Sequence, residues 1–263
     1  MPNGYAARNM PSFDRSRVVF STHGIKHLHH LGDFFNALYT RDPNEMFAIK
    51  VDAEISAFVG VGAVMTNANQ IRYGQTPPIM LDIKLGDMPT VVANAAQALS
   101  QIHEPVAFTV NPSSGMASLK AAIDNRGICQ VIVSTVNTSL GDQDCLRIYN
   151  RDRLSQVMTF AEMAAEAGAQ GIIVGGWEIE ALKKLGLDPS LKIYGAGIRP
   201  TWFTDPGDNY RTATPTQAIR QSADKIIVGG PVLKQPDHAS QRQAAQRILR
   251  EVNMALRNQA TTV

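Results

Sequence analysis

The chain contains 263 residues, of which 44% are hydrophobic and 18% are charged, so it can bury a large core. Its 25 Lys and Arg residues nearly balance 23 Asp and Glu residues, and the net charge of +2 argues against the concentrated basic face of a nucleic-acid-binding protein. No apolar run approaches the roughly 20 residues of a membrane span, and the polar start of the chain lacks a signal-peptide core, so we expect a soluble cytoplasmic protein.

Eight strand-like runs alternate with helical patterns along the chain. Most runs are continuous Val- and Ile-rich stretches, which are typical of parallel strands covered on both faces. In chain order the predicted strands are Arg17–Thr22, Met46–Val51, Pro78–Lys84, Val106–Val110, Gln130–Thr135, Gln170–Val174, Lys192–Gly195 and Lys225–Gly229. Apolar spacing predicts helices over Thr90–Ile102, Leu154–Ala167 and Gln241–Leu256, and Thr214-Pro215 predicts a capped helix start.

This alternation predicts an α/β fold, a single closed (β/α)8 TIM barrel. A doubly wound open sheet is the alternative, although no Gly-rich dinucleotide-binding fingerprint follows the first strand. We expect the barrel at residues 17–257, with an N-terminal tail or cap at 1–16 and a C-terminal tail at 258–263. The two cysteines, Cys129 and Cys145, form no disulfide or metal-binding pattern, and Cys129 is interpreted as a small core residue.

The run D-I-K-L-G-D-M-P-T, residues 82–90, is the most informative motif. Alternation along a strand points Asp82 and Lys84 to the same face, and Pro89 places Asp87 in the loop that follows. A solvated loop with a surface ion pair is the simpler interpretation. A barrel, however, collects its strand ends at one mouth, where Lys50 would join the other three charges.

Glycines end the last two predicted strands, where barrels often bind phosphate. Their uncovered backbone N–H groups can cradle an anion, although the same glycines could serve only to make tight turns. Arg199 in the long loop between them could grip a phosphate with two hydrogen bonds, and Asn209 lies in the same loop. The candidate anion-binding residues are therefore Gly195, Gly197, Arg199, Asn209, Gly229 and Gly230.

Together these motifs resemble the orotidine 5′-phosphate decarboxylase family, from about Arg17 to Arg250. The matching segments occur in the order expected of the family. They are Ile49-Lys50-Val51, D-I-K-L-G-D-M-P at 82–89, Asn111-Pro112-Ser113-Ser114-Gly115, Thr135-Val136-Asn137-Thr138-Ser139, Gly197-Ile198-Arg199-Pro200 and Gly207-Asp208-Asn209.

The resemblance implies conversion of orotidine monophosphate to UMP and CO2 in pyrimidine biosynthesis, without a metal or an organic cofactor. Lys84 would protonate the carbon that loses CO2, Asp82 would face the substrate carboxylate, and Lys50 would contact the ribose. Asp87 would reach into the site of a partner subunit, so the active form would be a homodimer. The implied substrate-binding residues are Thr138, Ser139, Arg199, Asn209, Gly229 and Gly230.

Four departures from the family pattern affect substrate binding. Gly230 stands where the family has a phosphate-binding arginine after the last strand, which leaves Arg199 and Lys234 as the cations that could compensate. Val91 replaces a threonine, and Asn209 replaces a glutamine. The aspartate that ends the family's first strand and holds the ribose is absent, because Ser21, Thr22 and His23 stand there.

Two other functions remain open. One is the sugar-phosphate branch of the superfamily, the 3-keto-L-gulonate 6-phosphate decarboxylases and hexulose phosphate synthases, which use Mg²⁺ and share D-x-K-x-x-D. The other is a non-catalytic nucleotide-binding barrel, which would have no need for such costly paired charges.

His23, His27 and His30 could share one helical face, with Asp33 nearby, but we interpret them as a solvated helix start rather than a metal site. Trp202 and Phe203 in the loop after the seventh strand could cover a ligand or simply pack on the loop.

Overall fold

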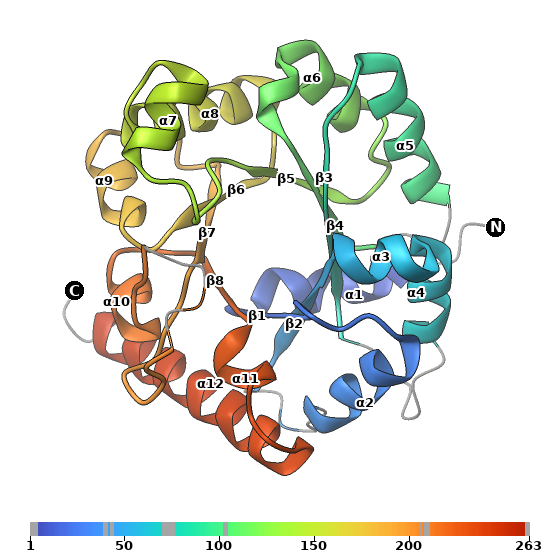
Figure 1. The fold of residues 1–263 in the computed structure, drawn as a ribbon, viewed down its shortest axis with the longest axis vertical. Coiled ribbons are helices and arrows are strands. Elements are labelled where there is room, and N and C mark those ends of the chain that lie inside the picture. The colour runs from blue at the N-terminus through green and yellow to red at the C-terminus, as the bar shows by residue number, and fades with distance from the viewer. Residues whose placement is uncertain are drawn as a thin grey trace.

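The protein is a closed barrel of eight parallel strands surrounded by helices, as seen along the barrel axis in the computed structural model (Figure 1). The structure describes residues 5–38, 42, 45–69, 77–101, 105–205, 207 and 211–260. The strands are β1 (Val18–Ser21), β2 (Phe47–Asp52), β3 (Ile79–Leu85), β4 (Ala107–Val110), β5 (Gln130–Ser134), β6 (Gly171–Gly175), β7 (Lys192–Ala196) and β8 (Lys225–Val228). β1 pairs in parallel with both β2 and β8, which closes the barrel.

The predicted TIM barrel is therefore confirmed, and the open-sheet alternative is wrong. Each predicted strand agrees with the observed one to within a single residue at either end. The agreement has a physical reason, because β1, β4 and β8 are buried along their whole length and such strands appear in sequence as unbroken apolar runs. Cys129 is fully buried in this core, as expected.

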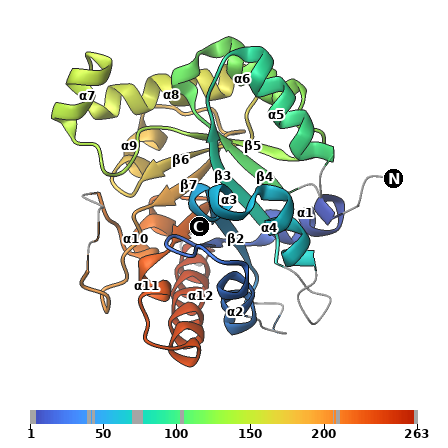
Figure 2. The same ribbon diagram turned by 45° about the vertical axis from the view of Figure 1, so that its right-hand side comes forward.

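Helices cover the outside of the barrel (Figures 1 and 2). Their bounds are α1 (Tyr5–Arg15), α2 (Leu28–Leu38), α3 (Ala53–Val59), α4 (Val61–Asn69), α5 (Pro89–Gln101), α6 (Met116–Asp124), α7 (Asp142–Tyr149), α8 (Arg153–Ala167), α9 (Glu178–Lys184), α10 (Pro215–Arg220), α11 (Gly230–Leu233) and α12 (His238–Ala260), with a 3₁₀ turn at Pro112–Ser114.

The predicted helices are present. α5 ends at Gln101, and Ile102 lies outside the described residues. The hydroxyl of Thr214 accepts a hydrogen bond from the Gln217 amide, while the Gln217 side chain accepts one from the Thr214 amide, so α10 begins with a capping box. α12 continues to Ala260, and residues 261–263 lie outside the described part.

Helix α1 packs against the amino-terminal end of the barrel. The Phe13 ring stacks on Tyr194 of β7, with centroids 6.4 Å apart. Lys225, at the start of β8, is buried and donates hydrogen bonds to the carbonyl oxygens of Phe13 (2.5 Å) and Ser16 (2.5 Å). These bonds satisfy carbonyl groups that the end of a helix leaves unpaired, so the barrel itself caps α1.

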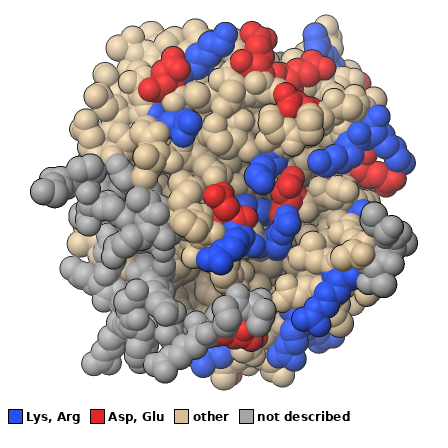
Figure 3. Space-filling model, turned by 180° about the vertical axis from the view of Figure 1, so that it is seen from behind, with Lys and Arg blue, Asp and Glu red and all other residues tan. Residues whose placement is uncertain are grey.

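Acidic and basic side chains are interspersed over the visible part of the face opposite to that of Figure 1 (Figure 3). This mixture agrees with the nearly balanced composition. Among the described residues, no helix combines the length and apolar character needed to cross a bilayer.

Candidate active site

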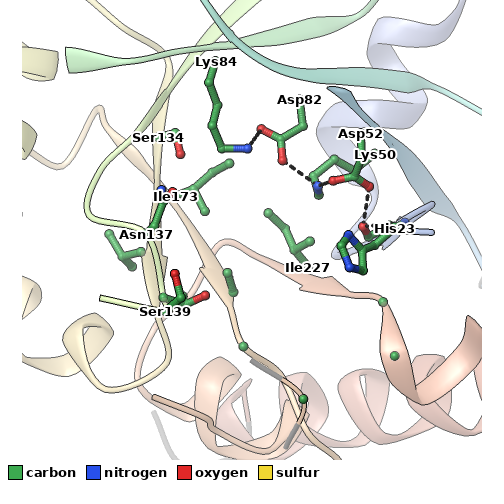
Figure 4. Close-up of a pocket in the computed structure, with 18 of the residues that line it drawn as sticks. His23, Lys50, Asp52, Asp82, Lys84, Ser134, Asn137, Ser139, Ile173 and Ile227 are labelled. Atoms are coloured by element: carbon green, nitrogen blue, oxygen red, sulfur yellow. Dashed lines mark hydrogen bonds and ion pairs between the residues drawn. The ribbon is translucent and has the colours of Figure 1, made fainter. Parts of the chain in front are cut away.

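A cavity of about 440 Å³ opens at the carboxyl ends of the strands (Figure 4). Its wall on the side of β1, β2 and β3 carries Ser21, Lys50, Asp52, Asp82 and Lys84. The opposite wall comes from the ends of β5, β6 and β7 and from the loops that follow β5 and β7. This position is where barrel enzymes place their catalytic groups.

Four charged side chains form a continuous chain along the first wall (Figure 4). The Lys84 ammonium donates to Oδ1 of Asp82 at 2.8 Å, and the Lys50 ammonium donates to Oδ2 of the same carboxylate at 2.6 Å. Lys50 also donates to Oδ1 of Asp52. The order is therefore Lys84, Asp82, Lys50, Asp52, with the charge alternating at every step.

The environment keeps the central groups of this cluster ionised. Burial raises the pKa of Asp82, but the ammonium groups of Lys50 and Lys84 outweigh it and hold that pKa below its ordinary value of 3.8. Burial likewise lowers the pKa of Lys50, but Asp52 and Asp82 together raise it above 10.5. Asp82 and Lys50 at the centre of the cluster are therefore both charged at neutral pH.

Lys84 reaches Asp82 through an irregular backbone. The pairing of β3 with β4 shifts register between Leu81 and Leu85, and Lys84 has a φ of 46°, in the left-handed region. The expectation that Asp82 and Lys84 face the same way is thus fulfilled by a bulge rather than by regular alternation. A lysine in this conformation is strained, and strain of this kind gathers at functional sites.

Thr109 of β4 fixes this bulge, and sequence reasoning missed it. Its hydroxyl accepts a hydrogen bond from the Lys84 backbone N–H at 2.9 Å and donates to Oδ1 of Asp82 at 2.9 Å. Thr109 is fully buried. A single threonine within an apolar strand carries no signal of this role in the sequence.

Asp52 was also missed, although the sequence contains a signal for it. The segment Lys50-Val51-Asp52 has the same two-residue spacing as Asp82-Ile83-Lys84, and alternation along a strand brings its two charges to one face. Oδ2 of Asp52 accepts a hydrogen bond from the Ser21 hydroxyl at 2.7 Å. A carboxylate from β2 therefore lies against the end of β1.

Asp87 does not join the cluster of its own chain. It is exposed in the loop before α5, where its carboxylate accepts the Met88 amide at 2.6 Å and its carbonyl accepts the Ser118 hydroxyl at 2.7 Å. The expectation that Asp87 completes the site of a second subunit stays a prediction.

The opposite wall is mostly uncharged. Asn137, Thr138 and Ser139, in the loop after β5, line the cavity together with the apolar side chains of Ile173 and Val174 of β6. Figure 4 shows Asn137 and Ser139 across the cavity from the charged cluster. Polar groups next to an apolar surface suit a flat heterocyclic ring.

At its third side the cavity contains the glycines and cations expected to bind an anion. Gly197, Gly229, Gly230, Arg199 and Lys234 line it, whereas Gly195 does not and Asn209 lies outside the described residues. A Cβ atom placed on Gly230 would lie 3.7 Å from the Phe203 ring and 3.9 Å from Nη2 of Arg199, so a Cβ atom fits there without a clash. The Lys234 ammonium pairs with Asp205 at 2.5 Å.

The three histidines do not form the set that one helical face would give. His23 borders the cavity, whereas His27 directly precedes α2 and His30 lies within it, with their ring centroids 5.8 Å apart. In the described part of the chain, no three or more His, Cys, Asp or Glu side chains gather in a way that could hold a metal ion. Of the two aromatic residues expected to cover a ligand, Trp202 packs against α12, with the Cζ atom of Arg247 4.9 Å from the centroid of its ring. Phe203 instead lies beside Gly230 at the edge of the cavity.

Comparison with known proteins agrees with this geometry. The family model of the Orotidine 5′-phosphate decarboxylase / HUMPS family matches residues 29–248. The chain is 33% identical over 187 residues to Orotidine 5′-phosphate decarboxylase of Paramagnetospirillum magneticum, covering 67% of this chain and 77% of the relative. It is 33% identical over 209 residues to that of Moorella thermoacetica, covering 75% and 79% respectively.

Among solved structures, that of Orotidine 5′-phosphate decarboxylase from Lactobacillus acidophilus superposes with a TM-score of 0.73. The two chains are 26% identical, and the superposition covers 90% of this chain and 99% of the other.

Proposed function

Because this chain belongs to the orotidine 5′-phosphate decarboxylase / HUMPS family, we propose that it converts orotidine monophosphate to UMP and CO2 in pyrimidine biosynthesis. One observation carries the proposal: the alternating cluster Lys84–Asp82–Lys50–Asp52 lies in the wall of a cavity whose other walls suit a ring and an anion.

The chemistry follows from fixed charges. Asp82 faces the carboxylate of the substrate, and their repulsion is relieved when neutral CO2 leaves. The Lys84 ammonium stabilises the negative charge that develops on the carbon and then donates a proton to it. Such preorganised charges favour the transition state over the bound substrate, and the reaction proposed here needs no metal or organic cofactor.

Substrate recognition is divided between the remaining walls. Thr138 and Ser139 contact the base, while Lys50 contacts the ribose. Arg199, Gly229 and Gly230 bind the phosphate, and we assign Asn209 to the same group on the sequence motif alone.

Asp52 offers a substitute for the carboxylate that the first strand lacks. Ser21 occupies the family's aspartate position, and its hydroxyl donates to Asp52, which brings a carboxylate to within 2.7 Å of that place. We infer that Asp52 contacts the ribose hydroxyls in its stead. The cluster is thereby retained with one of its members supplied by the neighbouring strand.

We further propose a cytoplasmic homodimer in which Asp87 of each chain enters the site of the other. The exposed apolar side chains of Met88 and Val91 next to it support an interface there, because large apolar groups on a surface mark contact sites.

The sugar-phosphate branch is the second candidate function, and the observation that favours it is the D-x-K-x-x-D run at residues 82–87, which that branch shares. The enzymes of that branch act on smaller substrates and use Mg²⁺. A binding barrel without turnover is disfavoured by the cost of the buried cluster.

The test is direct. Purified protein is mixed with orotidine monophosphate in the presence of EDTA, and the loss of the orotate absorbance is followed. We expect turnover by the wild type, loss of at least about 10³-fold in kcat for Lys84→Ala, and no change for Lys120→Ala, an exposed lysine on α6. Turnover only with Mg²⁺ and a keto-sugar phosphate would support the sugar branch, and UMP binding without turnover would support the binding barrel.

A further inference from the structure

Arg211 is the largest fully buried side chain of the described residues, with 1% of its surface exposed. It stands where the connection between β7 and α10 returns to the barrel. Its guanidinium donates to Oε1 of Glu178 at 2.6 Å and to the carbonyl oxygens of Val136 (3.2 Å) and Asn137 (2.6 Å). One side chain from the β7 connection thus bonds to the first residue of α9 and to the loop after β5.

The carbonyl groups that Arg211 binds belong to the cavity wall. Val136 and Asn137 begin the loop whose next two residues are Thr138 and Ser139. Because both carbonyls are directed at the buried guanidinium, the backbone of this loop has a fixed orientation relative to the cavity. A charge-assisted hydrogen bond of this kind is stronger than one between neutral groups.

The backbone of Arg211 lies at the base of the loop that contains Arg199, so its buried side chain anchors that base. Its own carbonyl accepts the Gly176 amide at 3.2 Å, and two residues later Ala213 exchanges hydrogen bonds with Gly197 and Arg199. A Cβ on Gly176 would lie only 2.6 Å from that of Ala213, so the close approach requires glycine.

Burying this network costs free energy that a purely structural contact would not require. Glu178 is as deeply buried as Arg211, and its Oε2 lacks a hydrogen-bond partner among the described residues, as does Nε of Arg211. Buried ion pairs are often no more stabilising than apolar packing of the same volume. The buried pair lies beside the β5 loop and the base of the β7 loop, which both line the cavity, and this points to a role in placing those two loops.

We propose that Arg211 is a positioning residue that holds the β5 loop and the base of the β7 loop in the geometry that binds the substrate. The proposal rests on the function proposed above and assigns a role to a residue that does not touch the ligand. Its prediction concerns ligand affinity: when Arg211 is replaced, Thr138, Ser139 and Arg199 stay chemically intact but are displaced.

Arg153 provides a matched control. It donates to the same Oε1 of Glu178 at 2.8 Å, but it does so from α8 and pairs on its outer side with Asp142. Arg211→Gln and Arg153→Gln each remove one guanidinium from one carboxylate, and only the first removes the bonds to Val136 and Asn137. Arg211→Lys keeps a positive charge beside Glu178, but its single nitrogen cannot reproduce the planar set of bonds.

The first measurement is steady-state kinetics with orotidine monophosphate, together with the Kd of UMP. We expect Arg211→Gln and Arg211→Lys to raise KM and the Kd of UMP, lowering kcat/KM by about 10- to 100-fold, since displacing binding groups by about 1 Å costs that much. Arg153→Gln should stay within about threefold of the wild type. A purely structural role would lower the folded fraction and hence the apparent kcat, leaving KM unchanged, and would overturn the proposal.

The second measurement is hydrogen exchange of the backbone amides at Asn137, Thr138 and Ser139, which does not depend on substrate identity. We expect these three amides to exchange faster in Arg211→Lys than in the wild type, and to exchange at the wild-type rate in Arg153→Gln. Equal exchange in the two variants would overturn the positioning role. Should the wild type neither turn over orotidine monophosphate nor bind UMP, the proposed function fails and this exchange experiment alone decides the role of Arg211.

Discussion

The carboxylate that this barrel carries on β2 can be moved back to β1 by exchanging two side chains. Ser21 and Asp52 are joined by a 2.7 Å hydrogen bond, and Ser21 pairs with Lys50 in the register of β1 with β2. The perturbation is the double variant Ser21→Asp/Asp52→Ser, compared with each single substitution. If the carboxylate serves mainly to balance Lys50, its strand of origin should matter little.

The structure sets the expected magnitudes. The Lys50 side chain is 8% exposed and that of Asp52 is 16% exposed, so their pairing is little screened by solvent. Removing one partner of a fully buried pair costs about 3–5 kcal/mol, but Lys50 keeps Asp82, so we expect Asp52→Ser to lower the free energy of unfolding by about 2 kcal/mol. Ser21→Asp alone places a third carboxylate beside two ammonium groups and should cost about 1 kcal/mol.

The assay is urea denaturation at pH 7.5, followed by tryptophan fluorescence and far-ultraviolet circular dichroism, with Glu180→Ser on the exposed Lys184 pair as the control. We expect the double variant to recover at least about 1 kcal/mol relative to Asp52→Ser, which corresponds to a favourable coupling of about 2 kcal/mol between the two sites. The kcat/KM of the double variant should also recover relative to Asp52→Ser. Additive losses of stability would refute the idea that Asp52 replaces a first-strand carboxylate.

Two further predictions concern Asp82 and Gly230. Asp82→Asn should lower the free energy of unfolding by an amount that is constant from pH 8 to pH 5 and that shrinks by about 1 kcal/mol by pH 3. The reason is that the pKa of Asp82 in the folded protein lies below 3.8. As the pH falls, the unfolded chain takes up the proton first, so the stabilisation by the charged carboxylate is lost gradually. Urea denaturation across this range measures the difference, and a difference that is unchanged at pH 3 would contradict the pKa. Gly230→Arg should lower KM for orotidine monophosphate by about fivefold through a new contact with the phosphate, while Gly230→Ala and the Kd of uridine serve as controls. An unchanged or higher KM would place the phosphate away from Gly230.

The fold was predictable because its signals are local. Each strand is an apolar run that ends in polar or glycine residues, and burial on both faces of a parallel sheet produces this pattern directly. The Thr214-Pro215 start of α10 was equally readable, since a capping box depends on residues only three positions apart.

The charged cluster was predictable only in part. Asp82, Lys84 and Lys50 lie at strand ends, and the barrel topology alone brings them together. Thr109 acts through the shifted pairing of β3 with β4, which nothing in the sequence of either strand reveals. Arg211 looks like an ordinary loop arginine in the sequence, and its burial arises only when three loops distant in the chain converge.

The two lysines of the cluster differ in their access to bulk water. The Lys84 side chain is 40% exposed, whereas that of Lys50 is 8% exposed. In the proposed reaction Lys84 gives away a proton in each cycle and must regain one before the next, and the exposure of its side chain lets bulk water reach its ammonium group. Lys50 is buried between the carboxylates of Asp52 and Asp82, which raise its pKa, so it keeps its proton. Under the proposed function, one lysine is an acid that water can reprotonate after each cycle, and the other remains a buried counter-ion.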